Sequence, residues 1–165
     1  MYNKLWIVGV LLLTQVACSR QTVYIVRHAE KMAAAGAMMS SDVPLSAQGE
    51  QRAQKLARLL ADKGIAYIFS TPTIRTQATA GPLSQRLGVP VERYHPKDTL
   101  AQFLARIRSL SKGNVLIVGH SNTVDDLVNG LTGRQWLQDL PETEYDNLFL
   151  LQKRGATYRF RRQKF

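Results

Sequence analysis

The chain of 165 residues has little cysteine, glycine or proline: one, eleven and six residues, respectively. A single cysteine excludes an internal disulfide framework and a cysteine-rich zinc site. The glycine and proline counts, together with 45% hydrophobic residues, exclude a collagen-like, low-complexity or disordered chain. The length fits about one domain, and the sequence shows neither an internal repeat nor a linker long enough for a second domain.

Acidic residues are also scarce, at 12 against 22 Lys and Arg, which gives a formal net charge of +10. This balance favours an anionic partner, and nucleic acid, anionic lipid and phosphorylated small molecules all satisfy it. The basic run at 153–164 falls in a predicted hairpin, and we expect it to form a solvated or membrane-facing surface. We therefore expect no nucleic-acid partner.

A hydrophobic run of transmembrane length is missing as well. The apolar run at 5–13 has nine residues, which is too short to span a bilayer as a helix. It follows Lys4 and precedes small residues, a pattern typical of a secretory signal peptide. A buried strand or helix at the N-terminus is the alternative interpretation.

The single cysteine, Cys18, stands where a bacterial lipoprotein carries its lipid-modified cysteine, although Gln15 occupies a position that is usually aliphatic. Ordinary signal-peptidase cleavage nearby is the alternative. We expect a signal peptide with a lipobox over 1–18 and a folded domain over 20–165. The predicted location is the bacterial cell envelope, with a lipid anchor on the periplasmic side or otherwise in the periplasm.

After residue 20, apolar and β-branched runs alternate with segments of helical periodicity. This alternation predicts an α/β fold: a three-layer sandwich with a mostly parallel sheet, helices on both faces and an antiparallel edge. Expected strands lie at 22–26, 65–69, 90–94, 115–118, 148–151 and 156–160. Expected helices begin at a Ser46 cap, at about Thr73 with an interruption at Gly81-Pro82, at an Asp98 cap, and just after 120–122.

Polar residues directly after the apolar strands are the first candidates for chemistry, because ligands bind beyond the carboxyl ends of strands in such sheets. Arg27 and His28 follow the first strand, Arg75 follows the second, and His120 follows the fourth. Arginines beside neutral imidazoles suit a phosphoryl group, and histidine can act as a covalent nucleophile. The turn at 121–123 adds backbone donors at a helix start. The arginines would repel a cation, so we expect no metal and no cofactor.

Four segments carry a family resemblance. VYIVRHAEK at 23–31 resembles the opening signature of the histidine phosphatase (phosphoglycerate mutase-like) superfamily, a strand followed by Arg-His-Gly. LSAQG at 45–49 is similar to the family's Leu-Thr/Ser-x-x-Gly. STPTIRTQATA at 70–80 resembles its Ser-x-x-x-x-Arg-(Ala/Thr)-x-x-Thr-Ala block, and VGHSN at 118–122 resembles its second histidine block. The resemblance implies the small single-domain phosphatase type.

The resemblance also implies roles for individual residues. His28 would be the nucleophile that becomes phosphohistidine, and Arg27 and Arg75 would hold the phosphoryl oxygens. His120 would be the second pocket histidine, which donates to the phosphoryl group in the transition state. Phosphoryl transfer needs positioning and charge neutralisation above all, and a cationic pocket supplies both without magnesium.

The departures from the family pattern concern the residues around this core. Ser121 follows His120 where one branch of the family has an acidic residue, and Ser121 and Asn122 are expected to bind substrate. The proton donor therefore has to come from elsewhere in the chain. Glu92 and Asp98 are the candidate acids, with a solvated strand position and a helix cap as their structural alternatives.

The predicted function is that of a metal-independent phosphatase that hydrolyses a phosphomonoester or a phosphohistidine through phospho-His28. The expected partners are the phosphorylated small molecule or phosphohistidine substrate and, through the lipid anchor, the membrane; we expect a monomer. The alternative function is that of a non-catalytic envelope lipoprotein that binds phosphate or a polyanion in the same pocket.

Overall fold

The computed structural model describes residues 21–33 and 42–165, except for the side chains of residues 96–98. The predicted signal segment and Cys18 lie outside the described residues. In the described part, helices are too short or too polar to cross a membrane.

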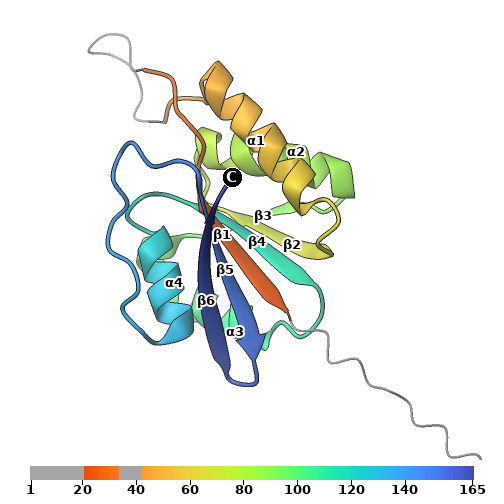
Figure 1. The fold of residues 1–165 in the computed structure, drawn as a ribbon, viewed down its shortest axis with the longest axis vertical. Helices are drawn as coiled ribbons and strands as arrows, with labels where there is room; N and C mark the ends of the chain where they lie inside the picture. Colours follow the sequence, from red (N-terminus) through yellow and green to blue (C-terminus); the bar gives the residue numbers. More distant parts are fainter. Residues whose placement is uncertain (1–20, 34–41) are drawn as a thin grey trace, which may run out of the picture.

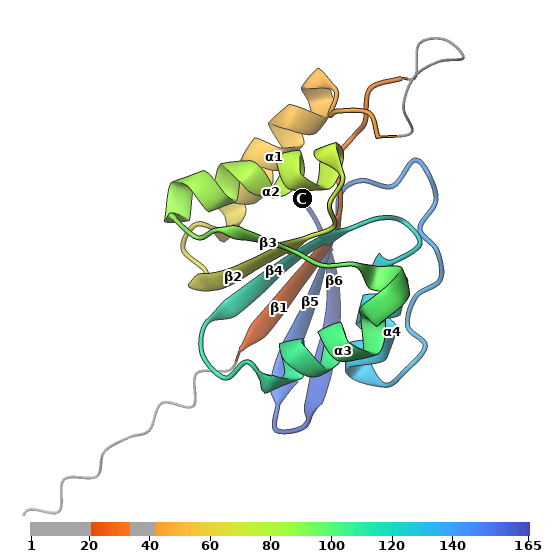
Figure 2. The ribbon, with the colours of Figure 1, turned by 180° about the vertical axis from the view of Figure 1, so that it is seen from behind.

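A six-stranded sheet forms the centre of the molecule, and helices cover both of its faces (Figures 1 and 2). The strand order is β3-β2-β4-β1-β5-β6. The first four strands in this order are parallel, while β5 is antiparallel to β1 and to β6. The predicted sandwich with an antiparallel edge is confirmed. In chain order the elements are β1 (Thr22–Arg27), α1 (Ala47–Leu60), β2 (Ile65–Ser70), α2 (Ile74–Leu87), β3 (Val91–Arg93), α3 (Pro96–Ser109), β4 (Asn114–Gly119), α4 (Val124–Thr132), β5 (Asn147–Arg154) and β6 (Thr157–Lys164).

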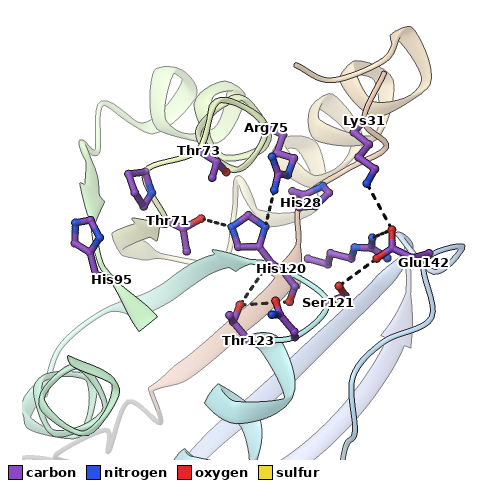
Figure 3. Close-up of a pocket in the computed structure, with 13 residues that line it drawn as sticks. His28, Lys31, Thr71, Thr73, Arg75, His95, His120, Ser121, Thr123 and Glu142 are labelled. Carbon is purple, nitrogen blue, oxygen red and sulfur yellow. Dashed lines mark hydrogen bonds and ion pairs between the residues drawn. The ribbon is translucent and has the colours of Figure 1, made fainter. Parts of the chain in front are cut away.

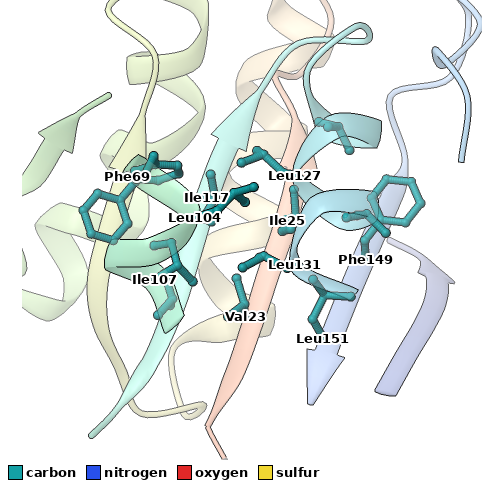
Figure 4. Close-up of a cluster of buried hydrophobic side chains, with 14 of the residues drawn as sticks. Val23, Ile25, Phe69, Leu104, Ile107, Ile117, Leu127, Leu131, Phe149 and Leu151 are labelled. Atoms are coloured by element: carbon teal, nitrogen blue, oxygen red, sulfur yellow. The ribbon is translucent and has the colours of Figure 1, made fainter. Parts of the chain in front are cut away.

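Two apolar cores lie on opposite faces of the sheet, because successive side chains of a strand point in opposite directions. Val23 and Ile25 of β1 belong to the core under α3 and α4, which Figure 4 shows. Tyr24 and Val26 belong to the core under α1 and α2. All of β1 is buried, which explains its unbroken apolar sequence. The strand that carries Arg27 is therefore held rigidly from both sides.

Two helices differ from the prediction. α2 runs through Pro82 without a break, although proline removes one backbone hydrogen bond. Buried Ala80 and Leu83 on either side of Pro82 anchor the helix to the core, and this packing outweighs the lost bond. α3 begins at Pro96 with His95 as its N-cap, so Asp98 lies inside the helix and is not its cap.

The start of α1 is fastened to the loop that follows β1. The Ser46 hydroxyl accepts a hydrogen bond from the Gly49 amide at 3.1 Å, and the Ser46 amide donates to the Glu30 carbonyl at 2.9 Å. A side chain at position 49 would collide with that same carbonyl, so only glycine fits there. Arg52 of α1 adds a 2.6 Å ion pair with Glu30. The loop after His28 is thus fixed by the helix that packs over it.

Candidate active site

A pocket of about 560 Å³ opens at the carboxyl ends of β1, β2 and β4 (Figure 3). Its lining combines residues from 27–31, 71–75 and 120–123, which are far apart in the sequence. They meet because the three strands are parallel neighbours and end at one edge of the sheet. We call Arg27, His28, Thr71, Arg75 and His120 the inner wall of this pocket.

His28 is buried at the centre of the inner wall, with 3% of its surface exposed. Its amide donates to the Gly119 carbonyl at 2.9 Å, which ties it to the end of β4. Its Nδ1 lies 2.8 Å from the Ala29 carbonyl, which can only accept, so Nδ1 carries the proton. Burial, with smaller contributions from Arg27 and Arg75, lowers the pKa of His28 to about 3. The imidazole is therefore neutral, with a lone pair on Nε2.

His120 faces His28, with the two ring centres 5.4 Å apart. Arg75 lies 3.4 Å from its Nδ1, and because a guanidinium only donates, that nitrogen is unprotonated. The proton on Nε2 is directed at the Thr71 hydroxyl, 2.8 Å away, which in turn donates to Thr76 at 3.0 Å. Burial, followed by Arg75 and Arg27, lowers the pKa of His120 to about 4. Both histidines of the inner wall are thus neutral at physiological pH.

Arg27 is held from three sides and is 2% exposed. One terminal nitrogen donates to the Pro141 carbonyl at 2.9 Å, and the other to the Glu142 carboxylate at 3.1 Å. The guanidinium carbon lies 4.2 Å from the centre of the Tyr145 ring, in cation–π contact. The buried Nε of Arg27 has no acceptor in the described part of the chain. A buried donor of this kind is suited to an incoming anion.

Arg75 reaches the pocket from the first turn of α2. Its guanidinium forms a 3.2 Å ion pair with Asp42, whose carboxylate also accepts from the Ile74 amide at 2.9 Å. The sequence around 70–80 contains no acidic residue, which predicts an arginine without a structural partner. That prediction is wrong, because Asp42 comes from 33 residues upstream. Arg75 therefore contacts both a structural carboxylate and the His120 ring.

The outer rim of the pocket consists of Lys31, His95, Ser121 and Glu142, which we call the mouth (Figure 3). Glu142 links three of the surrounding groups: Arg27 at 3.1 Å, Lys31 at 3.6 Å and the Ser121 hydroxyl at 3.4 Å. Its side chain is 69% exposed. The mouth thus carries both charge signs, whereas the charged groups of the inner wall are cationic.

Comparisons with known proteins agree with this geometry. Residues 23–96 match the family model of the histidine phosphatase superfamily (branch 1). The "Probable phosphoglycerate mutase GpmB" of Citrobacter koseri is 34% identical over 118 residues, which cover 66% of this chain and 50% of that protein. The chain spans half the length, or less, of the first curated relatives that it matches.

Solved structures share the fold. A protein described as the phosphohistidine phosphatase SixA from Agrobacterium tumefaciens superposes with a TM-score of 0.68 at 22% identity, over 88% of this chain and 98% of that one. A SixA protein histidine phosphatase complexed with tungstate has a TM-score of 0.67 at 18% identity, over 87% and 97%. The chain thus has the fold of these phosphatases, and its residues 23–96 match the histidine phosphatase superfamily.

The histidine phosphatase fold brings the predicted site residues together. Arg27, His28, Arg75 and His120 line one pocket, and Ser121 and Asn122 line it beside the start of α4. Gly119 precedes His120 at a point where a side chain would meet the hydroxyl oxygens of Thr123 and Tyr94. Over residues 21–33 and 42–165, His, Cys, Asp and Glu side chains form no group of three suited to a metal ion.

The structure places one candidate acid outside the pocket lining. Glu92 lies on the edge strand β3, outside the pocket lining, where its carboxylate pairs with Arg106 of α3 at 2.6 Å. The side chain of Asp98 lies outside the described residues, and its candidacy stays a prediction.

Sequence reasoning missed the contribution of the segment 141–145, which supplies Glu142 and Tyr145. A signal was available: β5 is antiparallel to β1, with Val26 paired to Leu148, so the residues before β5 return to the carboxyl end of β1. At the edge of the sheet where the parallel strands end, an antiparallel strand contributes the residues that precede it. Only the residues that follow each strand were considered from the sequence, so 141–145 was not included.

Proposed function

We propose that this histidine phosphatase superfamily member is a metal-independent phosphatase that acts through a phosphohistidine at His28. One observation carries the proposal: the buried His28 ring is neutral and presents an Nε2 lone pair to a pocket whose other walls are Arg27, Arg75 and His120. A neutral nucleophile beside two permanent cations suits an anionic electrophile.

The reaction follows from this placement. Arg27 and Arg75 would take the phosphoryl oxygens, using donors that now bind Glu142 and His120. Nε2 of His28 attacks phosphorus, the bond to the leaving group breaks, and a water then displaces phosphate from His28. The anion in the pocket would raise the pKa of His120, which allows that ring to take up a proton and donate to the phosphoryl group.

The substrate class is proposed as a phosphomonoester or a phosphohistidine. Proteins that share the fold are described as phosphohistidine phosphatases, and one of them holds tungstate, an oxyanion of phosphate-like shape and charge. A curated relative is named for a phosphoglycerate mutase, which handles a small phosphomonoester. The pocket volume of about 560 Å³ accommodates either leaving group at its mouth.

The test uses the purified protein, p-nitrophenyl phosphate and a phosphohistidine peptide, all in EDTA. Turnover in EDTA is expected, together with an acid-labile, alkali-stable phosphate on His28 in protein quenched with alkaline detergent. Strict dependence on a divalent metal, or phosphate trapped on another residue, would overturn the proposal. A protein that binds phosphate tightly but turns over neither substrate would be the non-catalytic binder.

We further propose that the protein is exported and carries lipid on Cys18. The support is the apolar run at 5–13 and the small residues that flank Cys18. Labelled palmitate should attach to the protein expressed in bacteria, and Cys18→Ser should lose the label. An unlabelled wild-type protein in the periplasm would show that Gln15 prevents lipidation.

A further inference from the structure

A leaving group that departs as an alkoxide needs a proton, so we compare Glu92 and Asp42 with the carboxylate in the described pocket lining, Glu142. Glu92 faces Arg106 outside it. Both oxygens of Asp42 share the N–H of the Ile74 amide, and Oδ1 also pairs with Arg75, so the carboxylate is held at the start of α2. Glu142 lines the pocket itself. Of the three, Glu142 is the carboxylate with access to a substrate.

The position of Glu142 is set by its backbone while its side chain keeps freedom to move. The Leu140 amide donates to the Ser121 carbonyl at 3.0 Å, and the Pro141 carbonyl accepts from Arg27 at 2.9 Å. These bonds attach the loop directly to the inner wall. The carboxylate, 69% exposed, is held by contacts of 3.1 to 3.6 Å with Arg27, Lys31 and Ser121. The Glu142 side chain can therefore change its conformation without disturbing the backbone of the loop.

We propose that Glu142 is the general acid and base of the reaction, an inference that rests on the proposed function. In the first step the Glu142 carboxyl gives its proton to the leaving oxygen as the P–O bond breaks and the bond from His28 Nε2 to phosphorus forms. In the second step the carboxylate takes a proton from the attacking water. The N–P bond breaks, its electron pair returns to Nε2, and the Glu142 carboxyl is regenerated.

The charges around Glu142 explain how one residue can serve both steps. In the empty pocket Arg27 and Lys31 hold the pKa of Glu142 below its ordinary value, so it is ionised. A phosphoryl dianion on Arg27 replaces that attraction with repulsion, which favours the protonated carboxyl. The groups that face Glu142 are Arg27 and Lys31 from β1 and its following loop and Ser121 from the turn before α4; the His28 and His120 rings nearby are neutral.

The experiment compares leaving groups in wild type, Glu142→Gln and a matched control, Glu92→Gln. Glutamine keeps the size of glutamate and one acceptor oxygen, but it cannot donate a carboxyl proton. With an alkyl phosphate, whose alkoxide needs a proton, Glu142→Gln should lower the rate of phospho-His28 formation by on the order of 10²-fold. With p-nitrophenyl phosphate, whose phenolate is stable, the rate of the first burst of phenolate, which reports formation of phospho-His28, should change by less than about threefold. The later turnover should slow, because the variant lacks the base that activates water. Glu92→Gln should match wild type on both substrates.

Other outcomes would overturn the role of Glu142. An equal loss in the rate of phospho-His28 formation on both substrates would make the residue a structural or electrostatic element. If Glu142→Gln lowered KM and left kcat unchanged, the only role of Glu142 would be to compete with the substrate phosphate for Arg27. These results are separate from a failure of the proposed function, in which wild type would form no phospho-His28 even from p-nitrophenyl phosphate.

Discussion

The inner wall and the mouth of the pocket are built differently. His28 and Arg27 of the inner wall are at most 3% exposed, and their hydrogen bonds reach β4 and the loop before β5. Lys31 and Glu142 of the mouth are 46% and 69% exposed and contact each other at 3.6 Å. Groups locked by packing hold a reacting geometry, while exposed groups can follow a substrate. The difference suggests chemistry at the wall and selection and proton transfer at the mouth.

The largest expected effect separates two histidines of the same pocket. His28→Ala should lower kcat on the order of 10⁴-fold or more, because it removes the covalent path itself. His95→Ala, at the mouth, should change kcat by less than about threefold. Steady-state kinetics with p-nitrophenyl phosphate measures both. Comparable losses of kcat in the two variants would show that the inner wall and the mouth do not differ in their contribution to catalysis.

Arg75 should have the next largest effect. Arg75→Ala removes a donor to the phosphoryl group and should lower kcat/KM by on the order of 10²-fold or more. Arg75→Lys should recover only part of this loss, because an ammonium cannot make a bidentate contact. The Asp42 pair means that Arg75→Ala should also lower the melting temperature, by a few degrees. Asp42→Asn is the control, since it breaks that ion pair and leaves the guanidinium in place.

A variant of Arg75 that is destabilised but fully active per folded molecule would make the arginine structural. The same kinetics and melting curves decide this. Asp42→Asn should lower the melting temperature as much as Arg75→Ala does, with a far smaller loss of kcat/KM. Equal catalytic losses in both would show that the ion pair, and not the guanidinium alone, sets the phosphoryl contact.

Much of the fold and the inner wall could be predicted from the sequence, because strand order and site position follow from local rules. Apolar runs such as 115–118 mark buried strands, and the polar residues after them mark the edge where ligands bind. Thr79 of the second motif shows why that motif has its spacing: its hydroxyl accepts from the Ala29 amide at 3.0 Å and donates to the Arg75 carbonyl at 2.8 Å. It joins two motifs 50 residues apart.

The mouth could not be predicted in the same way. Glu142 reaches Arg27 across 115 residues of sequence, and Asp42 reaches Arg75 across 33. Both contacts depend on how loops return to the sheet edge, which hydrophobic periodicity does not encode. The exposed carboxylates therefore carry no local pattern that distinguishes them from solvated surface residues such as Glu92, which pairs with its neighbouring helix.

The two histidines of the inner wall should also make stability depend on pH. Their pKa values in the folded protein, about 3 for His28 and about 4 for His120, lie below the ordinary 6.5. The unfolded chain therefore binds protons below pH 6.5 that the folded chain excludes. Stability is full above pH 6.5 and falls toward pH 4.5 by about 1.4 kcal/mol per pH unit for each histidine. Melting temperatures across this window measure the loss.

His120→Asn should flatten this pH dependence, because one of the two excluded protons is removed. Saturating inorganic phosphate should flatten it as well, since an anion on Arg27 and Arg75 favours protonated imidazoles. His95→Ala should leave the slope as it is. A melting temperature that stays constant from pH 6.5 to 4.5 in the wild type would contradict the neutral, buried state of both rings.

The smallest expected effect on kinetics is that of Lys31, a residue of the mouth. The ammonium is 46% exposed and 3.6 Å from Glu142, so its attraction for an anionic substrate is screened by water and partly cancelled by that carboxylate. An exposed charge of this kind is worth at most about 1 kcal/mol, which corresponds to a change of about fivefold. Lys31→Gln should therefore raise KM by about two- to fivefold at low salt and leave kcat unchanged. Because the screening length falls from about 10 Å at 0.1 M salt to about 3 Å at 1 M, the KM difference should disappear at high salt. Kinetics at both ionic strengths measure this. A loss of kcat, or a KM difference that persists in 1 M salt, would move Lys31 from the mouth into the set of groups that touch the transferring phosphoryl group.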